Sequence, residues 1–104
     1  MISNQILQNT IDGLKNITRI DLCIIDTEGK ILATTFLDAD RYISSAMALV
    51  DSPADSQVVS GCHFFKVFDD HQLEYILLAN GDSDDVYMIG KIASFQIQNL
   101  LVAY

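Results

Sequence analysis

The chain has 104 residues, of which 50% are hydrophobic and 19% are charged. This balance supports one compact core and argues against a disordered chain or a coiled-coil rod. The formal charge of −8, with only six scattered cations, argues against direct contact with nucleic acid, because phosphate binding requires clustered Lys and Arg. The apolar stretches are too short to cross a membrane and the first residues lack a signal pattern, so we expect a cytoplasmic protein without membrane contact.

The first predicted elements are a helix and a hairpin. An amphipathic helix begins at Ser3 or Asn4, and its apolar residues recur on one face. That face consists of Ile6, Leu7, Ile11, Leu14 and Ile17. The apolar runs 21–26 and 31–35 flank a polar turn with a glycine, which predicts two paired strands.

The middle of the chain predicts a helix and two more strands. The helix extends from Arg41 to Val50, with Asp38 or Asp40 as its cap, and ends before Pro53. The strands are expected at 58–68 and 73–79, joined by a polar tip that allows a tight antiparallel connection. If the residues flanking the tip face each other, the register places Lys66 opposite Tyr75.

The last helix is predicted to open at the acidic segment 81–85, where Asp82 or Ser83 can cap backbone N–H groups, and to run to Tyr104. No stop signal follows, so we expect it to continue into a partner domain. One apolar face is interpreted as a seam for signal transmission: Val86, Ile89, Ala93, Ile97 and Leu100. Met88, Ile92 and Phe95 form a second apolar face.

Two apolar faces on one helix favour a homodimer, because one face covers the sheet and the other needs a partner. The alternative is that both faces are buried within one subunit. The predicted interface uses both terminal helices. Its residues are Ile6, Ile89, Ile92, Phe95 and Leu100.

The element order is helix, two strands, helix, two or three strands, helix. Both faces of the sheet are apolar, so the helices must cover both. This predicts an α+β fold with an antiparallel sheet, either PAS/GAF-like or profilin/roadblock-like.

Catalytic and metal chemistry have little support in the sequence. Cys62 and His63 are neighbours on a strand and point to opposite faces, so they cannot act as nucleophile and base. The two cysteines fit reduced core thiols, and neither metal-ligand spacing nor a glycine-rich phosphate loop is present. We therefore predict no enzyme, no metal and no cofactor.

A ligand pocket is expected between the central helix and the sheet face that carries Lys66. An Arg or Lys facing a carboxylate, with hydroxyl and amide partners, is the chemistry that a small-acid sensor requires. The candidate ligand residues are Arg41, Ser45, Ser56, Gln57, Lys66 and Tyr75. Taken singly, Arg41 also fits a solvated residue of a first helical turn, and Lys66 with Tyr75 an ordinary cross-strand pair.

The segments 17–33 and 81–90 resemble the sugar-diacid recognition domain that begins carbohydrate-diacid and purine-catabolism transcriptional regulators. The second segment has that family's Gly-acidic cap and Val-x-x-x-Gly helix opening. The resemblance implies that residues 1–104 form a single non-catalytic sensor of an organic or sugar acid, followed in a longer bacterial regulator by a helix-turn-helix. The alternative is a roadblock- or profilin-like protein-interaction scaffold without a small ligand.

Overall fold

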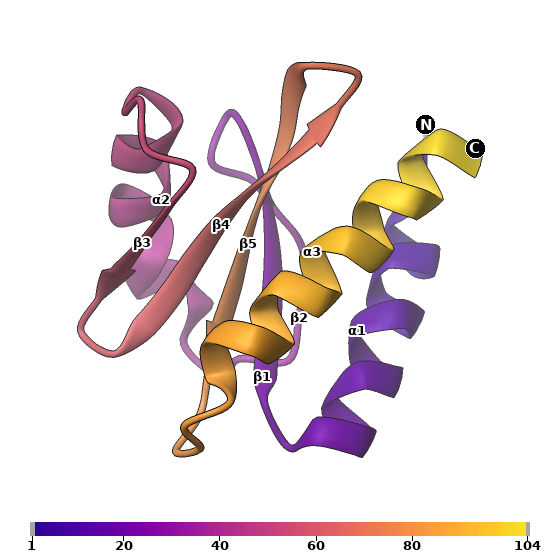
Figure 1. The fold of residues 1–104 in the computed structure, drawn as a ribbon, viewed down its shortest axis with the longest axis vertical. Coiled ribbons are helices and arrows are strands. Elements are labelled where there is room, and N and C mark those ends of the chain that lie inside the picture. Colours follow the sequence, from indigo (N-terminus) through magenta and orange to yellow (C-terminus); the bar gives the residue numbers. More distant parts are fainter. Residues whose placement is uncertain (1, 104) are drawn as a thin grey trace.

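The computed structural model describes residues 2–103 and shows one five-stranded antiparallel sheet with helices on both sides (Figure 1). The strand order across the sheet is β2-β1-β5-β4-β3. The elements in chain order are α1 (Asn4–Thr18), β1 (Asp21–Asp26), β2 (Ile31–Thr34), η1 (Ala39–Tyr42), α2 (Ile43–Val50), β3 (Ser56–Val59), β4 (Cys62–Asp69), β5 (Gln72–Asn80) and α3 (Val86–Ala103). The predicted α+β class and element order are confirmed, with three strands after the central helix.

Two apolar cores lie on the two faces of the sheet. α1 and α3 lie side by side over one face, and η1 with α2 covers the other (Figure 1). The core under α1 and α3 includes Leu7, Ile11, Leu22, Ile24, Phe65, Leu77, Ala93 and Ile97. The core under α2 includes Cys23, Ile25, Ala46, Leu49, Cys62, Phe64, Ile76 and Leu78. Strands buried on both faces explain why β1 and β5 are almost continuous apolar runs.

The first helix begins where the sequence predicts. The Ser3 hydroxyl accepts the N–H of Ile6 at 3.2 Å, which satisfies one of the free donors of the first turn. The helix ends at Thr18 and is capped by Arg19, which has φ 64° and donates its N–H to the Lys15 carbonyl at 2.8 Å. Ile17, predicted on the apolar face, is 82% exposed, because it lies in the last turn on the side away from the core.

The strand predicted at 58–68 is two strands. Ser60 and Gly61 both have positive φ, at 52° and 79°, and turn the chain back after β3. The two-residue turn was missed because apolar residues continue on both sides of it. The predicted tip after β4 is a tight turn of the same kind, with positive φ at Asp70 and His71.

The predicted register between β4 and β5 is wrong by one residue. Val67 pairs with Tyr75, and Lys66 pairs with Ile76. A β-bulge near the tip leaves Glu74 as an extra residue on β5, which shifts every pair beyond it. Tyr75 therefore belongs to the core under α1 and α3, whereas Lys66 lies on the α2 face.

The central helix starts differently from the prediction. Its first turn is the 3-10 helix η1, which contains Asp40, and α2 begins only at Ile43. Asp38 makes no side-chain cap hydrogen bond within residues 2–103; its carboxylate instead contacts the Arg41 guanidinium.

The last helix is confirmed, but the residues of its predicted signalling seam are buried in the core or packed against it and are not free to contact a partner. Val86, Ala93 and Ile97 are buried in the core, and the other two members of the seam pack against it. The seam residues are therefore the face that covers the sheet. Tyr104, the predicted last residue of the helix, lies outside the described residues.

Candidate functional site

The predicted ligand residues do not converge on one cavity. Arg41 is exposed, and its guanidinium lies 3.1 Å from the Asp38 carboxylate and 5.3 Å from the centroid of the Tyr42 ring. Lys66 donates from Nζ to the Ser52 carbonyl oxygen. Both cationic side chains therefore have partners within the protein and do not need a ligand to balance them.

The remaining four predicted ligand residues divide between the two faces of the sheet. Ser45, Ser56 and Gln57 are half-buried on α2 and β3. Gln57 pairs with Phe64 and lies on the α2 face with Ser45, whereas Ser56 pairs with Phe65 on the other face. The bulge in β5 places Tyr75 on that other face too, away from Lys66. Of the six residues, Tyr75 alone lines the cavity of about 750 Å³ beside the β1–β2 turn, and none lines the hollow beside Val102.

Cys62 and His63 point to opposite faces, as the sequence predicts. Cys62 lies in the core under α2, and burial raises the pKa of its thiol to about 12. His63 stacks on Phe65 at 6.3 Å and meets the ring of Tyr87 at 6.0 Å on the α3 side. A buried thiol with a raised pKa is a poor nucleophile, so this pair does not form a catalytic dyad. Among residues 2–103, no group of three His, Cys, Asp or Glu side chains is placed to hold a metal ion.

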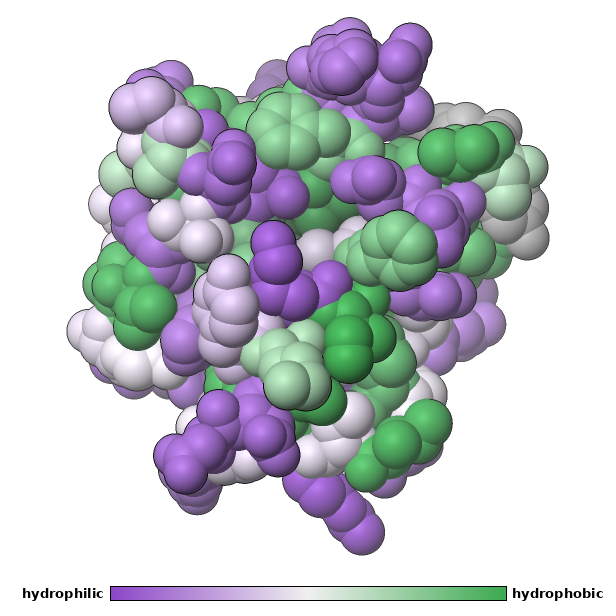
Figure 2. Space-filling model, viewed as in Figure 1, coloured by the Kyte–Doolittle hydropathy of each residue, from purple (hydrophilic) through white to green (hydrophobic). Residues whose placement is uncertain are grey.

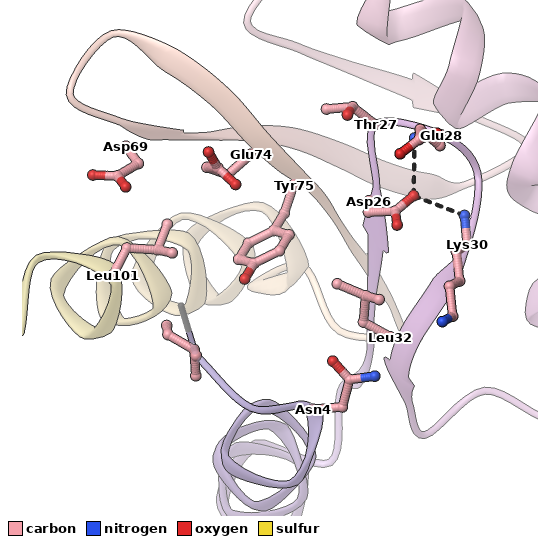
Figure 3. Close-up of a pocket in the computed structure, with 11 residues that line it drawn as sticks. Asn4, Asp26, Thr27, Glu28, Lys30, Leu32, Asp69, Glu74, Tyr75 and Leu101 are labelled. Carbon is pink, nitrogen blue, oxygen red and sulfur yellow. Dashed lines mark hydrogen bonds between the residues drawn. The ribbon is translucent and has the colours of Figure 1, made fainter. Parts of the chain in front are cut away.

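A cavity of about 750 Å³ opens where the β1–β2 turn, the β4–β5 hairpin and the outer ends of α1 and α3 meet (Figure 3). Its lining is strongly acidic, with four carboxylates against one ammonium. The lining residues are Ile2, Asn4, Asp26, Thr27, Glu28, Lys30, Leu32, Asp69, Glu74, Tyr75 and Leu101.

Two β-bulges shape this cavity. The bulge in β5 makes Glu74 an extra residue, so Glu74 and its neighbour Tyr75 both line the cavity. The second bulge lies between β1 and β2 and makes Leu32 an extra residue on β2. Leu32 lines the cavity, and its neighbour Ala33 is buried in the core. Bulges re-aim side chains and are frequent beside functional sites. Regular alternation along β5 places Glu74 and Tyr75 on opposite faces, so the sequence pattern does not predict this site.

The outer face of α3 is apolar and exposed. We call it the outer α3 face, and it consists of Tyr87, Met88, Ile92, Phe95 and Val102, each at least half exposed. Figure 2 shows apolar side chains gathered along the diagonal course of α3. A second hollow, of about 430 Å³, lies at its far end between Val102, Gln98 and the β4–β5 tip. Among the predicted dimer residues, Ile92 and Phe95 lie on this face, whereas Ile6, Ile89 and Leu100 are half-buried against the core.

The inner side of α3 approaches the sheet very closely at one point. A Cβ added to Gly90 would lie 2.2 Å from Cε2 of Phe65. The Phe65 ring packs in turn against Tyr87, with ring centroids 5.5 Å apart. Gly90 therefore fixes how close α3 lies to β4, and with it the position of the outer α3 face.

Neither a known protein-family model nor a curated protein matches this sequence. Among solved structures, the chain is similar to Myxococcus xanthus MglB, with 10% identity, a TM-score of 0.62, and coverage of 99% of this chain and 94% of that one. The fold is thus roadblock-like, which confirms the profilin/roadblock option of the predicted class. Within the described residues, no helix is long and apolar enough to cross a membrane.

Proposed function

We propose that this protein is a non-catalytic interaction scaffold that binds a second copy of itself through the outer α3 face. The observation that carries the proposal is the spacing of the exposed positions on α3. Four apolar side chains and one amide recur at alternating intervals of four and three residues: Met88, Ile92, Phe95, Asn99 and Val102. This spacing is typical of a helix that packs along another helix, and a polar residue at one position of such a seam selects the pairing register.

Charge favours a second copy as the partner. The chain carries a net charge of −8, yet the sequence of α3 contains a single charged residue, Lys91. Two copies repel each other wherever their acidic surfaces meet, and α3 is the longest element without an acidic side chain. A two-fold contact between these faces buries apolar surface and keeps the carboxylates apart. The similarity to MglB supports a scaffold through its fold alone.

The test is the oligomeric state of Phe95→Glu, measured by sedimentation velocity over a concentration series. A buried charge at the centre of the seam should raise the dissociation constant at least about tenfold. Leu37→Glu is the matched control, because Leu37 is fully exposed and lies in the loop before η1. Self-association that persists in Phe95→Glu, or a monomeric wild-type protein, would contradict the proposal.

A carboxylate-sensing role in a cytoplasmic bacterial transcriptional regulator remains a second prediction. The large cavity gives it little support, because its four carboxylates repel an anionic ligand. Thermal stabilisation by sugar acids or dicarboxylates tests it directly, since a ligand that binds the folded state raises the apparent stability. The predicted continuation of residues 1–104 into a helix-turn-helix domain is part of the same prediction.

A further inference from the structure

A largely buried tyrosine presents its hydroxyl group to the acidic cavity, and the described residues do not use that hydroxyl. Tyr75 is only 6% exposed, and within residues 2–103 no hydrogen bond involves its hydroxyl. Figure 3 shows the ring pointing its oxygen into the space between Leu101, Leu32 and Asn4. The ring is buried, but the oxygen itself is not, because within the described residues the buried side-chain polar atom without a partner is His63 Nδ1. The Tyr75 oxygen therefore reaches the open space of the cavity and is available to a bound molecule.

The charge around this hydroxyl is negative and is not neutralised. No carboxylate of the cavity forms an ion pair within the described chain, where the ion pairs are Lys15–Asp21 and Arg41–Asp38. Asp26 uses one carboxylate oxygen to accept the N–H groups of Glu28 and Lys30, each at 2.9 Å, which holds the β1–β2 turn.

Acidic side chains near the hydroxyl also affect its ionisation. Burial, followed by the charges of Glu74, Asp69 and Asp26, raises the pKa of Tyr75. The hydroxyl therefore stays protonated at neutral pH and can donate to, or accept from, a ligand.

We propose that this cavity binds an organic cation, an amine or guanidinium group, presented by a free polyamine or by a lysine or arginine side chain of a protein. The carboxylates come from the β1–β2 turn, the end of β4 and the bulge of β5, so negative charge lines several walls. A cation with several charged centres, or with delocalised charge, can contact more than one wall at once. The Tyr75 hydroxyl accepts one N–H from it, and the apolar side chains of Ile2, Leu32 and Leu101 contact its methylene groups.

The experiment is isothermal titration calorimetry at constant ionic strength, with spermidine in one arm and a capped arginine-lysine peptide in the other. Saturable binding of spermidine assigns the site to a small amine, and binding of the peptide alone assigns it to a protein side chain. Both results support the proposal. The absence of saturable binding in both arms would overturn it.

Paired variants separate a site from general charge attraction. Glu74→Gln combined with Asp69→Asn removes two charges from the cavity, and affinity should fall at least about tenfold. Asp84→Asn combined with Asp85→Asn removes the same charge before α3, and affinity should change by no more than about twofold. Equal losses in the two pairs would overturn the proposal.

Tyr75→Phe is the third variant, and it preserves the packing of the ring. It should weaken binding several-fold while the circular dichroism spectrum stays unchanged. Unchanged affinity would contradict the role given to the hydroxyl. Phe95→Glu should bind spermidine or the peptide like the wild type, so failure at this cavity is distinguishable from failure of the self-association proposed above.

Discussion

α1 and α3 cover the same face of the sheet, but their outer surfaces differ. The exposed positions of α1 are mostly polar, such as Gln5, Asn9 and Asp12, whereas those of α3 include four large apolar side chains in a single seam. Both helices bury one apolar face in the same core. The comparison shows that periodicity predicts the buried face of α1 well, because only one face is apolar, whereas α3 has two apolar faces and needs the tertiary structure to assign them.

The largest change in the free energy of unfolding is expected when the same substitution is made on the two faces of α3. Ile97→Ala removes a side chain that is 0% exposed and should lower the free energy of unfolding by about 3 kcal/mol, through lost burial and a cavity. Ile92→Ala, at a position that is 52% exposed, should cost less than about 1 kcal/mol. Urea unfolding at low protein concentration, where self-association is minimal, measures both. Similar losses for the two variants would show that the assignment of the faces is wrong.

The next largest change in stability is expected when a glycine of each helix is replaced by alanine. Gly90→Ala should destabilise the protein by about 2 kcal/mol, because the new methyl group meets the Phe65 ring. Gly13→Ala should stabilise it by about 0.5–1 kcal/mol, because a methyl group there meets no heavy atom of the described residues within 4 Å and alanine favours a helix.

Thermal unfolding of both glycine variants measures these opposite signs. Adding Phe65→Leu to Gly90→Ala should recover part of the loss, since the smaller side chain relieves the contact. Stabilisation by Gly90→Ala alone would contradict the close packing of α3 on β4.

The smallest changes in stability are expected at the starts of the two helices. Ser3→Ala removes the hydroxyl that accepts the Ile6 N–H in the first turn of α1 and should cost about 1 kcal/mol. Ser83→Ala removes a bond to the Asp85 N–H in the exposed loop before α3, and should cost less than about 0.5 kcal/mol. Far-ultraviolet circular dichroism during unfolding measures the stability of both variants. A larger loss of stability for Ser83→Ala than for Ser3→Ala would contradict the prediction.

Much of the fold could be predicted from local sequence, whereas the site could not. The Ser3 cap, the first hairpin and the tight turn at Asp70 and His71 are local features, and each has a local signal. The turn at Ser60 and Gly61 was missed because its neighbours are apolar and β-forming on both sides.

The pocket prediction depended on strand register. A single extra residue, Glu74, moved Tyr75 to the opposite face from Lys66 and created the acidic cavity. No local sequence pattern predicts such a bulge, because its position depends on how β4, β5 and the terminal helices pack together.

The sequence by itself determined the element order, the α+β class and the presence of more apolar surface on α3 than one contact can bury, because these follow from periodicity, caps and turn residues. Only the tertiary structure decided which face of α3 meets the sheet and which residues line a cavity. The physical reason is that side-chain direction depends on non-local pairing: a one-residue shift in a strand exchanges its two faces, and a helix with two apolar faces buries the one whose small residues, here Gly90 and Ala93, allow the closest approach.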